Sequence, residues 1–303
     1  MRVFRGLHHG GMAPACALTI GNFDGVHRGH QAMLALLRGE AAQRGVESCV
    51  LTFEPHPRDF FAARSGQQQT APARIGTLRD KLTDLAQCGV DQTVVLPFDS
   101  RLAGQSPQDF IDQVLLAGLG ARYVLVGDDF RFGARRQGDY AMLDAAGDAQ
   151  GFDVARMNSY EVHGLRVSSS AVRDALAAGR MDVAARLLGR PYRISGHVVH
   201  GLSATPLPGV ANLGVRPSLD PRDVNGGRVL LETHCLQWPA ELGPEGAYGK
   251  IIRVELLHKL HDERKYDGLE ALQQGIAKDC DDARTWLASM HAETHRQTTR
   301  DRI

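Results

Sequence analysis

Short apolar runs alternate with helix-like segments between residues 17 and 126, and this alternation constrains the fold more than any other feature. Because neighbouring parallel strands need a crossover connection, usually a helix, such a chain forms a parallel sheet with helices on both faces. The predicted fold class is therefore α/β. The four predicted strands are residues 17–20, 48–53, 92–96 and 123–126.

Several residues mark where the helices of this region begin. Residues 30–44 have apolar side chains at helical spacing, Thr77 with Asp80 has the spacing of a capping box, and Ser106 with Pro107 forms an N-cap and N1 pair. For the helix after Thr77 we expect one apolar buried face, formed by Leu78, Leu82 and Leu85.

Two more helices are predicted after residue 160. Ser168 or Ser169 can cap the first, which carries Arg173, and Asp182 can cap the second. The second helix ends at Gly189, a residue type that commonly follows the last helical turn.

Beyond residue 190 the pattern changes to strand-like runs separated by Gly- and Pro-rich turns, until residues 267–290 return to helical spacing. We predict a small β-barrel closed by this helix, followed by a polar, frayed tail. The change of pattern predicts two domains, residues 1–190 and residues 191–303.

The charge balance argues against partners that need a basic surface. Lys plus Arg and Asp plus Glu are both 35, so neither a nucleic-acid footprint nor a polybasic membrane patch is expected. No apolar run approaches the roughly 20 residues of a membrane span, and no signal peptide is expected. The five cysteines are far apart, which argues against structural zinc and suits a reducing cytoplasm.

Polar segments rich in glycine or proline follow the predicted strands. They read GNFDG, EPHP, PFD and GDDFRFG. In open parallel sheets ligands bind beyond the carboxyl ends of the strands. We therefore expect these segments to meet around a ligand.

The first of these segments continues as GNFDGVHRGH and carries two histidines, His27 and His30. A zinc site would need further ligands, and no cysteine, glutamate or third histidine completes a set nearby. Two partly exposed histidines at a helix start are the plainest alternative. Glycines let the backbone approach a ligand closely, and the free N–H groups of a helix N-terminus favour an anion. The segment therefore favours phosphate binding by imidazoles and backbone amides. It does not have the sequence of a Walker-type phosphate-binding loop.

GNFDGVHRGH resembles the H-x-G-H signature of the nucleotidyltransferase superfamily, in the form used by bacterial bifunctional riboflavin kinase/FAD synthetases. The resemblance spans nearly the whole chain through further segments in family order. They are TFEPHPRDFF, VGDDFRFG, SSSAVR, AARLLGRPY, GVANLGVRP, VLLETH and RVELLHKLHDERKY. It implies a Rossmann-like nucleotidyltransferase domain, followed by a riboflavin kinase β-barrel with a C-terminal helix.

For the N-terminal domain the resemblance implies that the phosphate of FMN attacks the α-phosphorus of ATP, giving FAD and pyrophosphate with Mg²⁺ present. His27 and His30 would hold the ATP phosphates as catalytic residues. No metal ligand is assigned. The other expected ATP-binding residues are Gly21, Asn22, Phe23, Asp24, Gly29, Ser168, Ser169 and Arg173.

By the same resemblance, two further segments would shape the flavin and adenine side of the site. The expected residues are Phe53, Pro55, His56 and Pro57, with Asp128, Phe130 and Arg131. The two phenylalanines also fit core aromatics, Arg131 fits a solvated charge, and Asp128 fits a turn residue that caps its own backbone.

In the C-terminal domain Glu232 matches the residue that the family is expected to use as general base on the riboflavin hydroxyl. An outward polar residue on a half-buried strand is the alternative. Family members have a Pro-Thr-Ala-Asn motif upstream, whose Thr and Asn are expected to bind Mg²⁺ and ATP phosphates, and this chain has none. Instead His200 and Gly201 run directly into LSATPLPGVANLG. Either the protein lacks the segment or the printed sequence omits it, and a protein that lacks it is expected to be a dead kinase.

Three functions fit these observations. The leading one is an FMN adenylyltransferase with a fused, incomplete riboflavin kinase domain, whose substrates are the small molecules ATP, FMN and riboflavin. The second is another nucleotidyltransferase, including a class I tRNA-synthetase-like protein, against which the zero net charge argues. The third is a catalytically silent flavin- or nucleotide-binding protein. The oligomeric state is not predicted.

Overall fold

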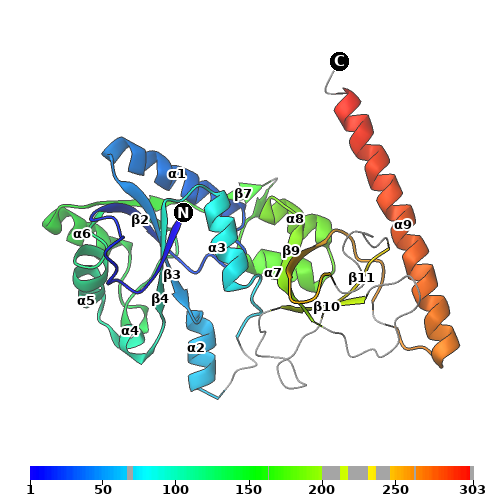
Figure 1. The fold of residues 1–303 in the computed structure, drawn as a ribbon. Helices are drawn as coiled ribbons and strands as arrows, with labels where there is room; N and C mark the ends of the chain where they lie inside the picture. The colour runs from blue at the N-terminus through cyan, green and yellow to red at the C-terminus, as the bar shows by residue number, and fades with distance from the viewer. Residues whose placement is uncertain are drawn as a thin grey trace.

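The computed structural model of this chain has an N-terminal α/β part and a C-terminal part with an antiparallel sheet and a long helix (Figure 1). It describes residues 1–66, 71–162, 164–199, 212–217, 231–236, 246–262 and 264–300. Within these ranges the side chains of residues 199, 212–217, 232, 234 and 291–300 lie outside the description.

A parallel six-stranded sheet organises the N-terminal part, with strand order β1-β4-β3-β2-β5-β6. The strands are β1 (Arg2–Arg5), β2 (Cys16–Ile20), β3 (Glu47–Glu54), β4 (Gln92–Pro97), β5 (Ala121–Gly127) and β6 (Asp153–Met157). The four predicted strands are confirmed as β2 to β5. The two edge strands were not predicted, because neither contains a fully buried residue and neither sequence has an apolar run.

Helices cover both faces of the sheet. Successive side chains of a strand point in opposite directions, so one strand contributes to the buried cluster on each face. Leu18 and Ile20 of β2 belong to a buried cluster with the π-helical segment Phe110–Leu116 and with α6 (Tyr140–Gln150). Ala17 belongs to the opposite cluster, which includes side chains of α1 (Arg28–Arg44) and α3 (Leu78–Gln87). Figure 1 shows α1 and α3 on the other side of the strands from α5 and α6.

The predicted helix starts are mostly confirmed. The capping box of Thr77 and Asp80 is formed, and Ser106 and Ser168 cap their helices. The prediction for Asp182 is wrong: it lies inside the first turn of its helix, which begins without a side-chain cap. The remaining helices and the small hairpin are α2 (Pro57–Arg64), α4 (Ser100–Gly104), α5 (Pro107–Asp109), α7 (Ser169–Ala177), α8 (Met181–Leu188), a 3₁₀ turn (Ala134–Arg136), β7 (Glu161–Val162) and β8 (Leu165–Arg166).

The buried face of α3 differs from the prediction. Leu85 is buried as expected, but Leu78 and Leu82 are only half-buried. The other residues that α3 buries are charged: Asp80, Lys81 and Asp84. Because buried charges need partners inside the protein, this face indicates that α3 borders a polar site.

The C-terminal part has four antiparallel strands in the order β11-β10-β9-β12, followed by α9. Their bounds are β9 (Tyr192–Val199), β10 (Asn212–Pro217), β11 (Leu231–His234), β12 (Ile251–Leu256) and α9 (Leu269–Arg300). The predicted helix is confirmed, but it continues to Arg300, beyond the predicted end at residue 290. Closure of these strands into a barrel falls on segments outside the described residues.

Candidate active site

The turn between β2 and α1 lies at the carboxyl edge of the sheet. β2 pairs with β3 on one side and with β5 on the other, so the strand order changes direction here. Open α/β sheets bind ligands at such a switch point, outside the carboxyl ends of the strands. The segment GNFDGVHRGH therefore occupies the position that the sequence predicts.

This turn holds two non-glycine residues in the left-handed region. Phe23 has φ of 48° and Val26 has φ of 40°, which is an outlier for a β-branched side chain. Gly25 between them has φ of 82°, and a Cβ there would lie 2.8 Å from a side-chain carbon of Ile75. Strain of this kind persists only where the surroundings enforce it, and it clusters at functional sites.

His27 and His30 stack on each other where α1 begins, with ring centroids 3.6 Å apart. His27 is the N-cap, and its Nδ1 accepts a hydrogen bond of 3.2 Å from the backbone N–H of His30. The His30 ring also lies against Phe23, and its Nδ1 is buried without a hydrogen-bond partner in the described part of the chain. Because an unpaired buried polar atom is costly, His30 is suited to receive a ligand.

Burial keeps both histidines neutral. Desolvation lowers the pKa of His27 to about 4, with a further lowering by the Arg173 guanidinium. Desolvation, His27 and Lys81 hold the pKa of His30 well below its usual range. A neutral imidazole donates one N–H but carries no charge. The positive charge that a triphosphate requires must therefore come from other side chains.

Asp24 ties the turn to two other segments. Its buried carboxylate accepts hydrogen bonds of 3.1 and 3.2 Å from the backbone N–H of Ile75 and forms an ion pair with Arg173. Ser169 Oγ donates to the carbonyl oxygen of Asp24 at 3.0 Å. Three predicted ATP-binding residues thus meet here. The charge of Arg173, however, is already paired with a carboxylate.

The other residues predicted on the ATP side lie around the same turn. Ser168 caps α7, its Oγ accepting from the backbone N–H of Ala171 at 3.2 Å. The carbonyl oxygen of Asn22 accepts from a hydroxyl of β3. A Cβ at Gly29 would lie 3.3 Å from the His27 ring, and one at Gly21 would lie 3.1 Å from the Phe23 ring. Both glycines therefore let neighbouring rings pack against the backbone.

The EPHP segment continues β3 at the same edge of the sheet. His56 is buried and caps α2, its Nδ1 accepting from the backbone N–H of Arg58 at 3.1 Å. Desolvation, then the charges of Arg74 and Lys81, lower the pKa of His56 to about 3. A third neutral histidine thus lies near the site.

The predicted flavin-side residues of this segment border an aromatic group. Phe53 packs edge-on against Phe98 with centroids 5.8 Å apart, Pro55 is exposed, and Pro57 is the first residue of α2. A pocket of about 570 Å³ opens beside α2. Its lining residues are Arg58, Phe61, Ala62, Ser65, Ala71 and Pro72.

The three residues predicted after β5 are engaged within their own region. Asp128 is exposed and accepts a hydrogen bond of 2.5 Å from Ser159 Oγ. Phe130 stacks on Phe132 with centroids 5.5 Å apart, and Arg131 forms an exposed ion pair. The structure therefore places these three residues at the same edge of the sheet as the histidine pair. Their described partners, however, lie in residues 132–166 and not in the histidine turn.

Sequence reasoning missed one largely buried arginine of the site. Arg74 forms ion pairs with Glu54 and Asp59, each 3.1 Å long. It lies in a loop that has no helix or strand periodicity. Nothing in the sequence pattern marks it as buried.

Sequence reasoning also missed Lys81, a lysine of α3 that is only 3% exposed. Its Nζ donates to Thr52 Oγ1 at the end of β3, 3.2 Å away. A signal was available: Lys81 lies three residues after Leu78 and four before Leu85, in the apolar stripe of the helix. A charge in that stripe is unusual, because lysine is almost never fully buried.

Glu232, the predicted general base of the C-terminal domain, lies in β11 opposite Gly214 of β10. Its side chain is outside the described residues, so its role stays a prediction. In the ranges that the structure describes, no three His, Cys, Asp or Glu side chains are placed to hold a metal ion together. None of the described helices is long and apolar enough to cross a membrane.

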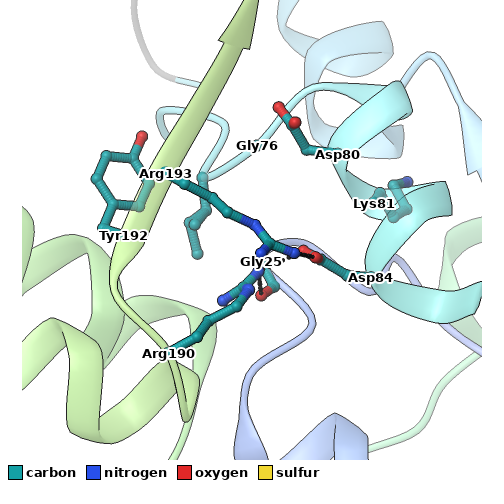
Figure 2. A pocket seen from close by; sticks show the side chains of 9 residues that line it. Gly25, Gly76, Asp80, Lys81, Asp84, Arg190, Tyr192 and Arg193 are labelled. Carbon is teal, nitrogen blue, oxygen red and sulfur yellow. Dashed lines mark hydrogen bonds and ion pairs between the residues drawn. The ribbon is translucent and has the colours of Figure 1, made fainter. Parts of the chain in front are cut away.

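An ion-pair cluster joins α3 to the start of the antiparallel sheet. One carboxylate oxygen of Asp84 accepts from Arg190 and the other from Arg193 (Figure 2). Arg190 also donates to the carbonyl oxygen of Gly25 at 3.0 Å. The cluster therefore connects the turn after β2 with β9, the first strand of the C-terminal part.

We expect Asp84→Asn to lower the free energy of unfolding by about 3 kcal/mol, because it leaves two guanidinium groups without their buried carboxylate. Urea denaturation of the whole chain measures this. The matched control is Asp182→Asn in α8, which removes an exposed ion pair with Arg186 and should cost below about 1 kcal/mol. Equal effects of the two substitutions would contradict this account of the cluster.

The neutral histidines predict a pH dependence of stability. The unfolded chain protonates histidine near pH 6.5, whereas the folded protein protonates His27 only near 4 and His56 only near 3. The unfolded state binds more protons between these values, so the free energy of unfolding falls as the pH drops below 6.5. Each histidine contributes up to about 1.4 kcal/mol per pH unit.

Urea denaturation at about pH 7 and about pH 5 tests this, with the double variant His27→Asn and His56→Asn as comparison. Both histidines are N-caps, and asparagine preserves a cap without titrating in this range. The double variant should lose less stability on acidification than the unaltered protein. An identical loss would show that these histidines are not the cause.

The fold and this site define an α/β protein of the nucleotidyltransferase type. The sequence profile of the FAD synthetase family matches residues 11–171, and that of the riboflavin kinase family matches residues 202–287. The chain belongs to the family of bifunctional riboflavin kinases/FMN adenylyltransferases.

Relatives with that name match nearly the whole chain. The protein from Pseudomonas fluorescens is 42% identical, with 95% of this chain and 98% of that protein covered. The one from Escherichia coli K12 is 40% identical, with 92% and 96% covered. The first alignment spans 323 positions, more than the 303 residues of this chain, so some residues of that relative have no counterpart here.

A solved structure also has the same fold. The crystal structure titled macrolide-efflux protein from Streptococcus pneumoniae superposes with a TM-score of 0.69, covering 94% of this chain and all of that one. The sequences are 21% identical. A likeness at this identity shows the fold alone.

Proposed function

We propose that this chain transfers the adenylyl group of ATP to the phosphate of FMN, giving FAD and pyrophosphate. The observation that carries the proposal is the turn after β2, where two stacked neutral histidines and the first N–H groups of α1 face the switch point of the sheet. Family membership and the FAD synthetase match over residues 11–171 support it.

In this reaction an oxygen of the FMN phosphate attacks the α-phosphorus of ATP. The bond from the α-phosphorus to the bridging oxygen breaks, and pyrophosphate leaves with the electron pair. The FMN phosphate is already ionised near pH 7, so no general base is required. The protein's task is to position both phosphates and to stabilise the charge that grows on the leaving group.

We assign His27 and His30 to the ATP phosphates as N–H donors, since both are neutral near pH 7. Asp24 orients Arg173 beside them, and Ser169 fixes the same segment through its hydrogen bond. The proposed ATP side comprises Gly21, Asn22, Phe23, Asp24, Gly29, Ser168, Ser169 and Arg173. The proposed flavin side comprises Phe53, Pro55, His56, Pro57, Asp128, Phe130 and Arg131.

Mg²⁺ is part of the proposal as a companion of the nucleotide. The described residues offer no cluster of three metal-binding side chains, and Mg²⁺ commonly binds through substrate phosphates. We therefore assign no residue of this chain as a metal ligand. When bound, Mg²⁺ neutralises phosphate charge.

We propose a domain boundary between residues 190 and 191. It falls between the two family matches, and β9 begins just after it, at Tyr192. The five unpaired cysteines fit a protein of the reducing cytoplasm. We propose small molecules, and neither nucleic acid nor membrane, as its partners.

The fused domain, residues 191–303, is the riboflavin kinase part. In the family it would phosphorylate riboflavin to FMN, with Glu232 as general base. This chain has no Pro-Thr-Ala-Asn motif, and its alignment with a relative is longer than the chain itself. We therefore propose that the adenylyltransferase is the active half.

Incubation of the purified chain with FMN and MgATP, followed by chromatography of the products, tests the proposal. FAD and pyrophosphate are expected in equal amounts. Binding of both substrates without turnover would instead identify a silent flavin- or nucleotide-binding protein. Pyrophosphate release with another phosphate or acid, but not with FMN, would identify a different nucleotidyltransferase.

A further inference from the structure

Three largely buried cations among the described residues lie near the histidines of the candidate active site and lower their pKa values. The side chains of Arg74 and Arg173 are 15% and 17% exposed, and Lys81 is 3% exposed. The histidines nearby are neutral. These three side chains therefore carry positive charge next to the histidines, whereas Arg190 and Arg193 share the carboxylate of Asp84.

Two of the three cations are already matched by carboxylates. Arg74 has Glu54 and Asp59, and Arg173 has Asp24. Their charges hold loops of the protein together. A phosphate that approached them would compete with a bonded carboxylate.

Lys81 differs from both arginines. Its described hydrogen bond goes to the neutral hydroxyl of Thr52, and no carboxylate in the described part of the chain lies within ion-pair distance of it. A buried charge without a directly bonded countercharge is costly. Such a group is retained where an anion completes it, and a phosphate is the anion that the proposed reaction brings.

The surroundings of Lys81 agree with this. Desolvation and the charge of Arg74 lower its pKa to about 8, although nearby carboxylates oppose the shift. Its field in turn lowers the pKa values of His30 and His56, so its ammonium lies close to the segments that follow β2 and β3. Because it comes from α3, it reaches the end of β3 from the face opposite α6.

We propose that the Lys81 ammonium binds a phosphoryl oxygen of a substrate during adenylyl transfer, with Thr52 holding it in place until the substrate arrives. This inference rests on the proposed function, because it takes ATP and FMN as the substrates. It makes Lys81 a catalytic residue with the phosphate of either one as its ligand. The competing role is purely structural, a tether from α3 to β3.

Binding of matched ligand pairs to Lys81→Met separates these roles. FMN is compared with riboflavin, and a non-hydrolysable ATP analogue is compared with adenosine, so each pair differs in its phosphate. We expect about 10- to 100-fold weaker binding of the phosphorylated member of at least one pair, as for loss of a charged hydrogen bond. The pair that responds identifies the phosphate. Riboflavin and adenosine should bind to the variant as they do to the unaltered protein.

The control is Arg79→Met, the same loss of a cation from the exposed face of the same helix, which should leave binding and FAD formation unchanged. Lys81→Arg should restore part of the phosphate-dependent affinity. Lys81→Gln, which can keep the bond to Thr52 without the charge, replaces the methionine variant if that one does not fold.

Two results would overturn the inference. In the first, Lys81→Met or Lys81→Gln binds both members of each pair as tightly as the unaltered protein does. In the second, the variant binds both members of a pair more weakly to the same extent, as expected if Lys81 is only a structural tether. Neither result touches the proposed function, which is judged by FAD formation in the unaltered protein. Conversely, if the unaltered protein formed no FAD, the proposed function would be refuted, but the binding comparison could still be interpreted.

Discussion

His30→Ala is expected to lower the kcat of FAD formation by about 10²- to 10³-fold, the usual cost of removing one donor to developing charge. The His30 ring has no described hydrogen bond within the protein; it only packs against His27 and Phe23. Its loss should therefore damage catalysis far more than folding. Steady-state kinetics with FMN and MgATP, alongside urea denaturation, measures both effects.

His30→Phe is the matched variant, because it keeps an aromatic ring against Phe23 and removes both ring nitrogens. We expect it to be as inactive as His30→Ala. His8→Ala removes an exposed histidine outside the site and should have no effect. If His30→Phe formed FAD at the unaltered rate, packing, and not N–H donation, would be the role of His30.

No conversion of riboflavin to FMN is expected from this chain. The segment that holds the Pro-Thr-Ala-Asn motif in the family would supply contacts to Mg²⁺ and to the ATP phosphates, and a general base at Glu232 cannot replace them. The expected effect is complete loss of one of the two reactions named for the relatives. Chromatography after incubation with riboflavin and MgATP measures it.

The intact mass of the purified protein is the control for this prediction. A mass that matches 33.0 kDa establishes that the protein itself lacks the segment. At that mass, steady production of FMN would contradict the prediction and would require another source of the phosphate-binding groups. A larger mass would show that the printed sequence omits residues, and the kinase reaction would then be expected.

The sequence was sufficient to predict the parts of the fold that repeat. The core strands β2 to β5 have apolar runs buried on both faces, and local signals such as the Thr77 capping box depend on neighbours in the chain. The site could be located because carboxyl ends of parallel strands share one edge. The place of the GNFDGVHRGH turn was therefore predictable, and its chemistry stays a prediction.

What escaped prediction depends on contacts between distant segments. Lys81 reaches Thr52 across the sheet edge, and Asp84 meets Arg190 across more than a hundred residues of chain. The helical spacing of apolar residues predicted that leucines form the buried face of α3. This pattern takes no account of charged side chains that are buried together with their partners. Asp182 was misplaced by two residues for a simpler reason: α8 begins with no side-chain cap.

A crystal structure with a non-hydrolysable ATP analogue and Mg²⁺ is the most direct test of the central claim, that imidazoles and helix N–H groups of this chain bind a triphosphate. The expected result places phosphate oxygens within hydrogen-bond distance of His27 and His30 at the start of α1. An analogue whose phosphates lie elsewhere, with residues 21–30 unchanged and without contact to them, would contradict the account.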